Sequence, residues 1–395
     1  MNILVTDSNY KHSLGIVRNL GQHGFQAMVL SSAGNSLCAH SKYCSEEVLV
    51  PSYEHADFER RFLDVLRRKK VELIIPVGAE TFKRLIPMKH KIEKYSKLIT
   101  VDFETFNIAT SKKETYQFAD SIGIPVPESY YPNDKADLFE LKKKIKYPCV
   151  IKGLYEVGKN IIDYAHNERD LFGKYRKLCE KNNLTASTGL PLVQEYIKGD
   201  IYGFFAIYNN GKCGATFQHH RLRQMPPSGG RSVAAESAMN EKVHEYGKKL
   251  LNALNWHGVA MVEFKVEQPS RPVLIEINPK FWGSLDLALE AGANFPVELI
   301  NIAENKKLEF TQNYKYPFRY HWPLHGDIDY LLKKRFKVFQ IVRDFLNPKV
   351  KSNLWFKDDW NASLYMLGKF LRQTILRIRN KIGLGFRVGY FRKSL

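Results

Sequence analysis

Two short stretches decide the fold: MVEF at residues 261–264 and LIEINP at residues 274–279. In both, apolar residues alternate with a carboxylate or an amide, which is typical of a strand with one buried face. On adjacent antiparallel strands, Glu263 and Glu276 would project from the same face, and Asn278 shares that face by the two-residue period. Two carboxylates and an amide oxygen suit Mg²⁺ that carries triphosphate oxygens. The alternative is the solvated face of an edge hairpin.

Two lysines upstream favour the magnesium interpretation. Lys152 ends the apolar strand 148–151, where a cation is costly unless it has an anionic partner. Lys112 opens a helix expected over residues 112–122, which the glycine and prolines at 123–127 end. Taken alone, Lys112 is also compatible with an ordinary surface lysine.

The order of these motifs over residues 107–305 resembles that of the ATP-grasp superfamily. Members open the ATP lobe with a lysine ahead of a Gly-Ile-Pro turn, as Lys112 does here. They continue with a strand of the form Tyr-Pro-x-Val-x-Lys, found here at residues 147–152. The resemblance implies that Lys112 and Lys152 contact ATP phosphates.

The same resemblance implies the other nucleotide and metal groups. The hinge between the lobes, whose backbone pairs with adenine, corresponds to Gln194, Glu195, Tyr196 and Ile197. Asp200 is the nearest carboxylate for the ribose hydroxyls. The metal ligands are Glu263, Glu276 and Asn278, holding Mg²⁺ or, as an alternative, Mn²⁺.

Three positions depart from the family pattern. The phosphate-covering loop at residues 153–160 has only two glycines, and Lys159 within it is expected to assist closure. Ile201 stands where many members carry a glutamate, which weakens the ribose assignment of Asp200. Lys280 replaces an arginine, so its contact with a phosphate would be that of a point charge.

A basic stretch at residues 217–232 contains further candidate site residues. Strand alternation places His219, Arg221 and Arg223 on one face, where cations suit the γ-phosphate or a substrate carboxylate. The glycine pair at 229–230 predicts a mobile loop over the site. It resembles a loop near the acceptor in some carboxylate–amine ligases. We therefore expect Arg221 and Arg223, with Lys280, to be catalytic; a solvated basic hairpin is the alternative.

Other residues near these motifs are expected to be structural. Phe281 and Trp282 should pack under the site, and Ser284 should cap the following helix. His12, His55 and His257 lack partners in the sequence and are interpreted as structural.

The fold class predicted is α/β, with α+β ATP lobes. Strand and helix patterns alternate over the first hundred residues, which predicts a parallel sheet covered by helices. The first strand-to-helix turn lacks GxGxxG, which argues against a dinucleotide site. The expected domains are a Rossmann-like domain at 1–106, ATP-grasp lobes at 107–193 and 194–310, and a basic, aromatic, mainly helical C-terminal segment at 311–395. The helices predicted in the first domain span 14–22, 57–69 and 80–94.

Charge is concentrated at the C-terminal end. The chain of 395 residues carries +19, and residues 331–395, with sixteen Lys or Arg against three Asp, carry +13 of it. Residues 364–379 have apolar positions at helical spacing. Three interpretations stay open: packing on the body, a membrane-surface helix, and binding of an anionic polymer or nucleic acid. Partners under the last two include an anionic membrane and an acidic glycan precursor.

The start of the chain lacks a signal-peptide pattern, and no apolar run is long enough to span a bilayer. Five scattered cysteines without metal-binding spacing indicate reduced thiols. We therefore expect a cytoplasmic protein, with the tail able to place it at the inner membrane face.

The resemblance implies an active ligase that phosphorylates a small-molecule carboxylate and couples it to an amine. A homodimer is compatible with it, and the absence of a carrier-lysine motif argues against biotin-linked carboxylation. One alternative is an ATP-binding regulatory protein with a degenerate site. A nucleic-acid-binding protein is disfavoured, because the charge is confined to the tail and no recognition motif is found.

Overall fold

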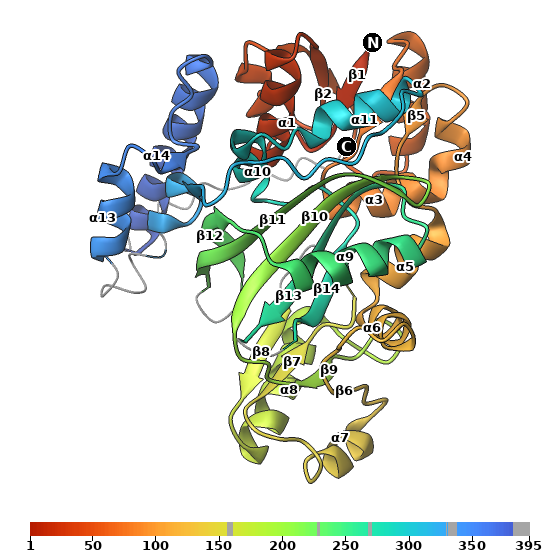
Figure 1. Ribbon diagram of the computed structural model, residues 1–395, viewed down its shortest axis with the longest axis vertical. Helices are drawn as coiled ribbons and strands as arrows, with labels where there is room; N and C mark the ends of the chain where they lie inside the picture. Colours follow the sequence, from red (N-terminus) through yellow and green to blue (C-terminus); the bar gives the residue numbers. More distant parts are fainter. Residues whose placement is uncertain (156–160, 227–229, 268–270, 329, 331–337, 382–395) are drawn as a thin grey trace, which may run out of the picture.

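The computed structural model describes residues 1–155, 161–226, 230–267, 271–328, 330 and 338–381. Figure 1 shows three sheets with helices against them: an N-terminal domain in red and orange, a small lobe in yellow, and a large curved sheet in green between them. The C-terminal helices, in blue, lie along one side. The predicted mixed α/β class with a parallel sheet is confirmed.

The N-terminal domain is the parallel sheet that strand and helix alternation predicted. Its strand order is β3-β2-β1-β4-β5, and every pair is parallel. The strands are β1 (Ile3–Val5), β2 (Ala27–Ser31), β3 (Cys44–Leu49), β4 (Leu73–Ile75) and β5 (Lys97–Leu98). The helices are α1 (Lys11–Gln22), η1 (Cys38–His40), α2 (Phe58–Arg68), α3 (Ala79–Leu85), η2 (Ile86–Met88) and α4 (Lys89–Ile92). The helix predicted over 80–94 is divided because Pro87 cannot donate a helical hydrogen bond.

Two capped helices, α5 (Phe103–Thr110) and α6 (Lys112–Ser121), lead into the small lobe. The Ser111 hydroxyl accepts from the Glu114 amide, which fixes Lys112 at the first position of α6. The small lobe has the antiparallel order β6-β9-β7-β8. Its elements are β6 (Ser129–Tyr130), α7 (Lys135–Leu141), β7 (Cys149–Lys152), β8 (Ile162–Ala165), α8 (Glu168–Asn182) and β9 (Leu192–Glu195). The predicted lobe boundary at 193/194 therefore falls inside β9.

The large sheet has seven strands in the order β14-β13-β10-β11-β12-β15-β16. They are β10 (Asp200–Asn209), β11 (Lys212–Met225), β12 (Arg231–Ser237), β13 (Gly258–Val266), β14 (Val273–Asn278), β15 (Arg319–His321) and β16 (Lys351–Ser352). Along β10, Phe204 joins one core with α9 (Glu241–Ala253), while Phe205 joins another with α10 (Leu285–Ala291) and α11 (Phe295–Ala303). Both faces of the sheet are thus buried in its middle.

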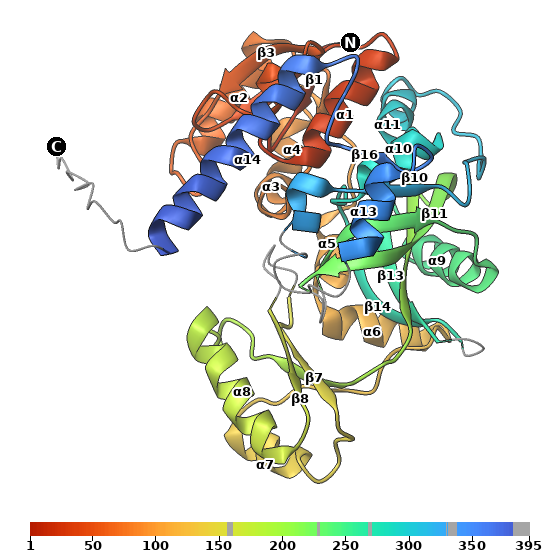
Figure 2. The same ribbon diagram turned by 90° about the vertical axis from the view of Figure 1, so that its left-hand side faces the viewer.

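Part of the C-terminal segment at residues 311–395 belongs to the large sheet. Its strands β15 and β16 extend the large sheet beyond β12. The other elements described are η3 (Pro323–His325), α13 (Val338–Leu346) and α14 (Trp360–Lys381). Figure 2 shows α14 running across the N-terminal domain, with its C-terminal end projecting from the body. Within the described part of the chain, every helix is too short or too polar to cross a bilayer.

Candidate active site

A cavity of about 610 Å³ lies where the three sheets meet. The N-terminal domain contributes the turns after β1 and β4, at residues 10–12 and 77–80. The small lobe contributes β7, β8 and β9, and the large sheet contributes the inner faces of β11 to β14. A site built from all three parts of the molecule can bind a ligand between them.

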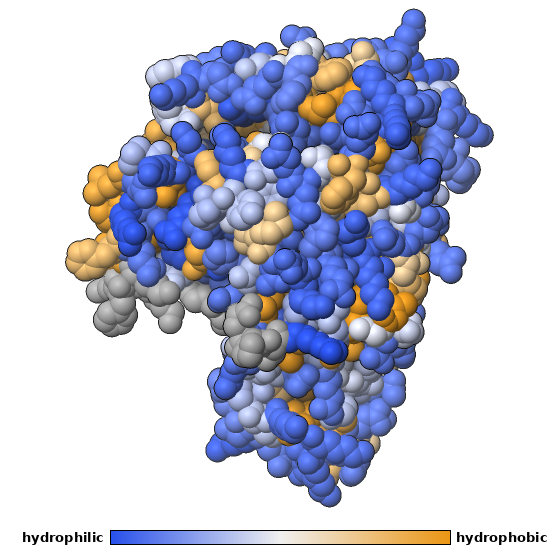
Figure 3. All heavy atoms as spheres, viewed as in Figure 1, coloured by the Kyte–Doolittle hydropathy of each residue, from blue (hydrophilic) through white to orange (hydrophobic). Residues whose placement is uncertain are grey.

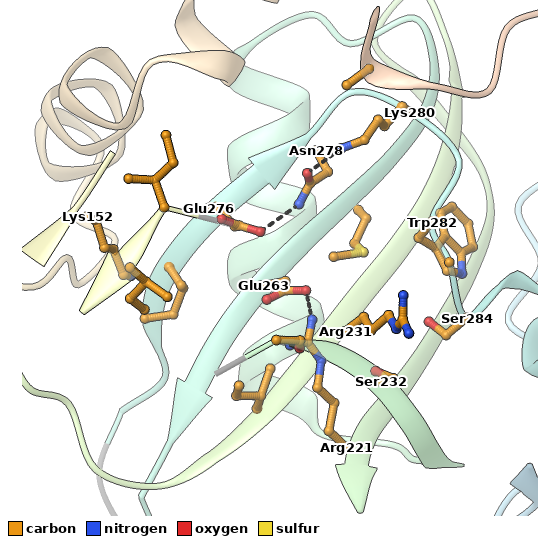
Figure 4. Close-up of a pocket in the computed structure, with 18 of the residues that line it drawn as sticks. Lys152, Arg221, Arg231, Ser232, Glu263, Glu276, Asn278, Lys280, Trp282 and Ser284 are labelled. Atoms are coloured by element: carbon orange, nitrogen blue, oxygen red, sulfur yellow. Dashed lines mark hydrogen bonds and ion pairs between the residues drawn. The ribbon is translucent and has the colours of Figure 1, made fainter. Parts of the chain in front are cut away.

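The acidic pair predicted from the sequence lies at the centre of this cavity. Glu263 on β13 is the direct cross-strand partner of Glu276 on β14, and Met261 is the partner of Asn278. All three polar side chains line the cavity, and Glu263 and Asn278 are each only 5% exposed. The Asn278 amide donates to Glu276 at 3.0 Å. The antiparallel register therefore places three oxygen-bearing side chains on one face (Figure 4).

Lysines surround the acidic cluster. Lys112 Nζ lies 4.0 Å from Glu276 Oε2, and Lys280 Nζ donates to Asn278 Oδ1 at 2.8 Å. Burial raises the pKa of Glu276, but Lys112, the Asn278 amide, Lys152 and Lys280 outweigh burial and leave the pKa below its ordinary value. Glu276 is therefore ionised at neutral pH.

Lys152, at the end of β7, lines the same cavity across from Glu276 (Figure 4). Burial, together with repulsion from Lys112, lowers the pKa of Lys152 to about 8. An anion placed between Lys112 and Lys152 would relieve this repulsion. The pair is thus suited to phosphate oxygens.

Arg221 on β11 reaches the acidic cluster from the opposite side. Its guanidinium donates to the Glu263 carboxylate and, at 2.8 Å, to the Gly230 carbonyl. Burial lowers the pKa of Arg221 to about 10, which leaves it charged at neutral pH. Arg221 neutralises Glu263 in this structure, so a metal ion at Glu263 would require the arginine to shift toward another anion.

Arg223 does not join Arg221, contrary to the sequence interpretation. It is buried away from the cavity lining and binds Asp327 at 3.0 Å and Asp344. The pairing of β11 with β12 shifts register on both sides of Arg223, which breaks the alternation on which the prediction relied. Arg223 therefore ties β11 to the C-terminal segment.

His219 lines the cavity but does not act as a third cation. Its Nε2 lies 2.8 Å from the Ser284 hydroxyl, and burial, with repulsion from Arg221, lowers its pKa well below the usual value. Ser284 uses its hydroxyl for this contact and makes no capping bond to α10. The expectation of a Ser284 cap is therefore wrong, while Phe281 and Trp282 are buried against the cavity as expected.

The predicted hinge lies along the cavity. Its lining includes Gln194, Glu195, Tyr196 and Ile197. Lys265 on β13 donates to the Ile197 carbonyl at 2.7 Å and lies 4.7 Å from the centre of the Tyr196 ring. This lysine, which the sequence interpretation missed, fixes the hinge to the large sheet.

Two residues that were expected to bind the nucleotide, Asp200 and Lys159, are not among the described residues that line the cavity. Asp200 is exposed, whereas its neighbour Ile201 lines the cavity. Adjacent residues of a strand point to opposite faces, so Asp200 at the start of β10 points away from the site. Lys159 lies outside the described residues, as do residues 227–229 of the predicted loop.

The residues present fit a magnesium ion with phosphate oxygens. Among the described residues, no group of three or more His, Cys, Asp or Glu side chains could enclose a metal by itself. Glu263, Glu276 and Asn278 instead supply a few hard oxygen ligands from one wall. Mg²⁺ commonly binds in this way, through one or two carboxylates together with substrate phosphates.

The sequence interpretation also missed a cluster at the N-terminal side of the cavity. Lys11, at the start of α1, lines the cavity with its Nζ 4.2 Å from the centre of the Trp322 ring. Trp322 Nε1 donates to Asp286 at 2.8 Å. Burial lowers the pKa of Lys11 to about 7, Asp286 opposes this shift, and Arg231 adds to it. His12, interpreted as structural, also lines the cavity.

One family model and several curated proteins match the sequence. Residues 192–323 match a family model described as "ATP-grasp in the biosynthetic pathway with Ter operon". The carbamoyl phosphate synthase large chain of Methanosarcina mazei is 25% identical over 115 residues, which span 28% of this chain and only 11% of that protein. An uncharacterized protein of Methanocaldococcus jannaschii is 21% identical over 301 residues, or 74% of this chain and 73% of that protein.

Solved structures agree with this result over most of the chain. The biotin carboxylase–βγ-ATP complex of Campylobacter jejuni has a TM-score of 0.68 at 18% identity, covering 80% of this chain and 74% of that one. N5-carboxyaminoimidazole synthetase of Staphylococcus aureus has a TM-score of 0.64 at 16% identity, with 85% of each chain covered. The chain therefore has the ATP-grasp fold, as the order of its motifs predicted.

Proposed function

We propose that this chain is an ATP- and Mg²⁺-dependent ligase that activates a carboxylate as an acyl phosphate and couples it to an amine. The observation that carries the proposal is the position of Glu263, Glu276 and Asn278 on one wall of the cavity, with Lys112 and Lys152 beside them. The fold, which ATP-dependent carboxylate ligases share, supports it. A reaction that consumes ATP also fits a cytoplasmic protein.

Each part of the cavity has a separate task in this proposal. Glu263, Glu276 and Asn278 hold Mg²⁺, which when bound neutralises the charge of the triphosphate. Lys112 and Lys152 bind phosphate oxygens, and the backbone of residues 194–197 faces the adenine. Arg221, once it leaves Glu263, stabilises the transferring phosphoryl group. No protein nucleophile is needed, because positioning and charge stabilisation suffice for phosphoryl transfer.

The reaction balances in two steps. A carboxylate oxygen attacks the γ-phosphorus, the bond from that phosphorus to the β,γ-bridging oxygen breaks, and ADP leaves. The amine nitrogen then attacks the acyl carbon, the bond from carbon to the phosphate oxygen breaks, and phosphate leaves. The nitrogen gives up one proton to become an amide.

In this proposal Lys11, which lines the cavity, accepts that proton. The lowered pKa of Lys11, about 7, leaves a large fraction of the lysine side chain neutral at physiological pH. Arg231 and Trp282 lie on the side of the acidic cluster away from Lys152 (Figure 4), where the carboxylate and amine substrates would bind. Arg231 supplies a cation for the substrate carboxylate.

A second candidate is an ATP-binding regulatory protein. The observation that favours it is Ile201, an apolar side chain that lines the cavity near the hinge while Asp200 points away. Such a protein would bind ATP without substrate-dependent release of ADP.

The test is ADP release from Mg-ATP across a panel of carboxylates and amines. We expect release that requires one acid–amine pair, and with the ¹⁸O-labelled acid one label should appear in the released phosphate. ADP release without label in the phosphate would contradict the acyl-phosphate route. Tight ATP binding with no release across the panel would favour the regulatory protein.

A further inference from the structure

The helix α14 carries an apolar stripe that does not face the protein. Trp360, Leu364, Leu371 and Ile375 recur at helical spacing along one side. Their exposed fractions are 54%, 54%, 51% and 56%. Large apolar side chains that remain half exposed along one face of a helix indicate a surface that is used for binding.

The opposite side of α14 is the one that packs on the body. Ala362, Ser363 and Met366 are buried, and the Tyr365 hydroxyl donates to the Asn35 carbonyl at 2.6 Å. The helix therefore packs on the body, as one of the three interpretations has it, but through these residues and not through Leu364 and Leu371. The face of α14 that contacts the protein includes Ala362, Ser363 and Met366, and Met366 joins the hydrophobic core.

A second helix exposes apolar residues on the same side of the molecule. In α13, Ile341 and Asp344 are buried, whereas Phe339 is 87% exposed and Leu346 is 77% exposed. Val338, Val342 and Phe345 are exposed as well. Both helices lie on the left-hand side of Figure 1, and Figure 2, in which that side faces the viewer, shows both at the front. Figure 3 shows apolar atoms at the left edge over α13.

The acidic and the exposed basic side chains described within residues 331–395 point in different directions. The three acidic residues within residues 331–395 are bonded to the body: Asp344 to Arg223, Asp358 to Arg18 and Tyr43, and Asp359 to Ser41. The exposed charged side chains described on the segment are cations, namely Arg343, Lys349, Lys351, Lys357, Arg372, Arg377 and Arg379. The outer surface is therefore more positive than the net charge of the segment implies.

We propose that the exposed apolar residues of α13 and α14, together with these cations, bind the surface of an anionic lipid bilayer. Helices that lie in the membrane interface combine an apolar face of Trp, Phe or Leu with basic residues, and α14 has both. The cations match the negative surface potential of anionic lipids. Trp355 and Trp360, whose ring centres are 4.4 Å apart, supply the aromatic groups favoured at that depth.

The apolar stripe distinguishes a bilayer from other anionic partners. A nucleic acid or an acidic glycan would engage the cations but would leave Leu364, Leu371 and Ile375 in water. A bilayer accommodates both kinds of residue at once.

The experiment is flotation of the full chain with vesicles of phosphatidylcholine alone and of phosphatidylcholine mixed with phosphatidylglycerol. Leu371→Glu tests the stripe, and Gln373→Glu is the matched control, because it adds the same charge at an exposed position off the stripe of the same helix. We expect the wild type to float with the mixed vesicles only. The control should lose roughly fivefold in partitioning, from one unit of charge. Leu371→Glu should lose about tenfold more than the control, because it also removes a membrane-buried side chain.

Three results would overturn the proposal. These are absence of the wild type from the floated fraction, equal binding to both vesicle types, and equal losses in the two variants. Retention on DNA by a chain that does not float would assign the cations to nucleic acid. Both substituted positions are exposed, so an unchanged thermal unfolding midpoint would confirm that each variant is folded.

Discussion

Charged side chains are arranged in opposite ways in the cavity and in the C-terminal segment. In the cavity, acidic and basic side chains face one another: Glu263 binds Arg221, and Glu276 lies beside Lys112. Within residues 338–381, the three acids are bonded to the body and the exposed charged side chains described are cations. Paired charges in a cavity can exchange partners when a compact charged ligand enters. Cations of one sign on an open face suit an extended anionic surface.

The largest effect should follow from breaking the cavity's charge pairs. In Glu263→Gln, one metal ligand is lost and Arg221 loses its partner, so kcat for ADP release should fall roughly a thousandfold. The matched control is Glu245→Gln on α9, an exposed carboxylate outside the cavity. Equal rates in the two variants would show that Glu263 is not part of the reaction site.

Arg223 should affect stability rather than chemistry. Its replacement in Arg223→Met would leave Asp327 and Asp344 buried without their cation, which costs about 3–5 kcal/mol of unfolding free energy. Denaturant unfolding measures this loss, and KM for ATP should stay unchanged below the transition. A large rise in KM for ATP with unchanged stability would restore the catalytic interpretation of Arg223.

Lys11 should control the pH dependence of turnover. The neutral Lys11 side chain is the active form, so kcat should rise with pH up to the Lys11 pKa of about 7 and then level off. In Lys11→Arg the group stays protonated, and kcat should fall roughly a hundredfold and lose this rise. The exposed Lys113→Arg serves as the control. A wild-type profile retained in Lys11→Arg would exclude Lys11 as the base.

Lys152 should control the pH dependence of ATP affinity. Its pKa in the free protein is about 8, and bound phosphate raises it, so ATP binding takes up a proton above pH 8. Affinity should therefore decrease as pH rises past 8, by up to about tenfold per pH unit. Calorimetric titrations should show this decrease in the wild type and a flat profile in Lys152→Arg. Parallel profiles in both would place Lys152 away from the phosphates.

The sequence was sufficient for features set by local pattern. The β13–β14 hairpin is such a case, since Glu263 and Glu276 are near neighbours in the chain and strand periodicity gives their common face. It was insufficient where a bulge intervenes, as at Arg223, because a register shift leaves no mark in the residue pattern. Lys11 was missed because its partners, Asp286 and Trp322, are distant in the chain.

The C-terminal helix shows a different limit. Periodicity in residues 364–379 predicted an amphipathic helix, and α14 covers that range. The pattern could not show which face packs on the body, because hydrophobic spacing is the same for a buried and an exposed stripe. Contacts of Tyr365 and Asp358 with the N-terminal domain decide the orientation.

The Mg-ATP site is tested most directly by calorimetric titration of ATP, with and without Mg²⁺, into the wild type and Glu276→Gln. We expect tight binding to the wild type that depends on Mg²⁺. In Glu276→Gln the affinity should fall, and adding Mg²⁺ should no longer strengthen it. Equal, Mg²⁺-dependent binding in both proteins would contradict the assignment of this cavity as the Mg-ATP site.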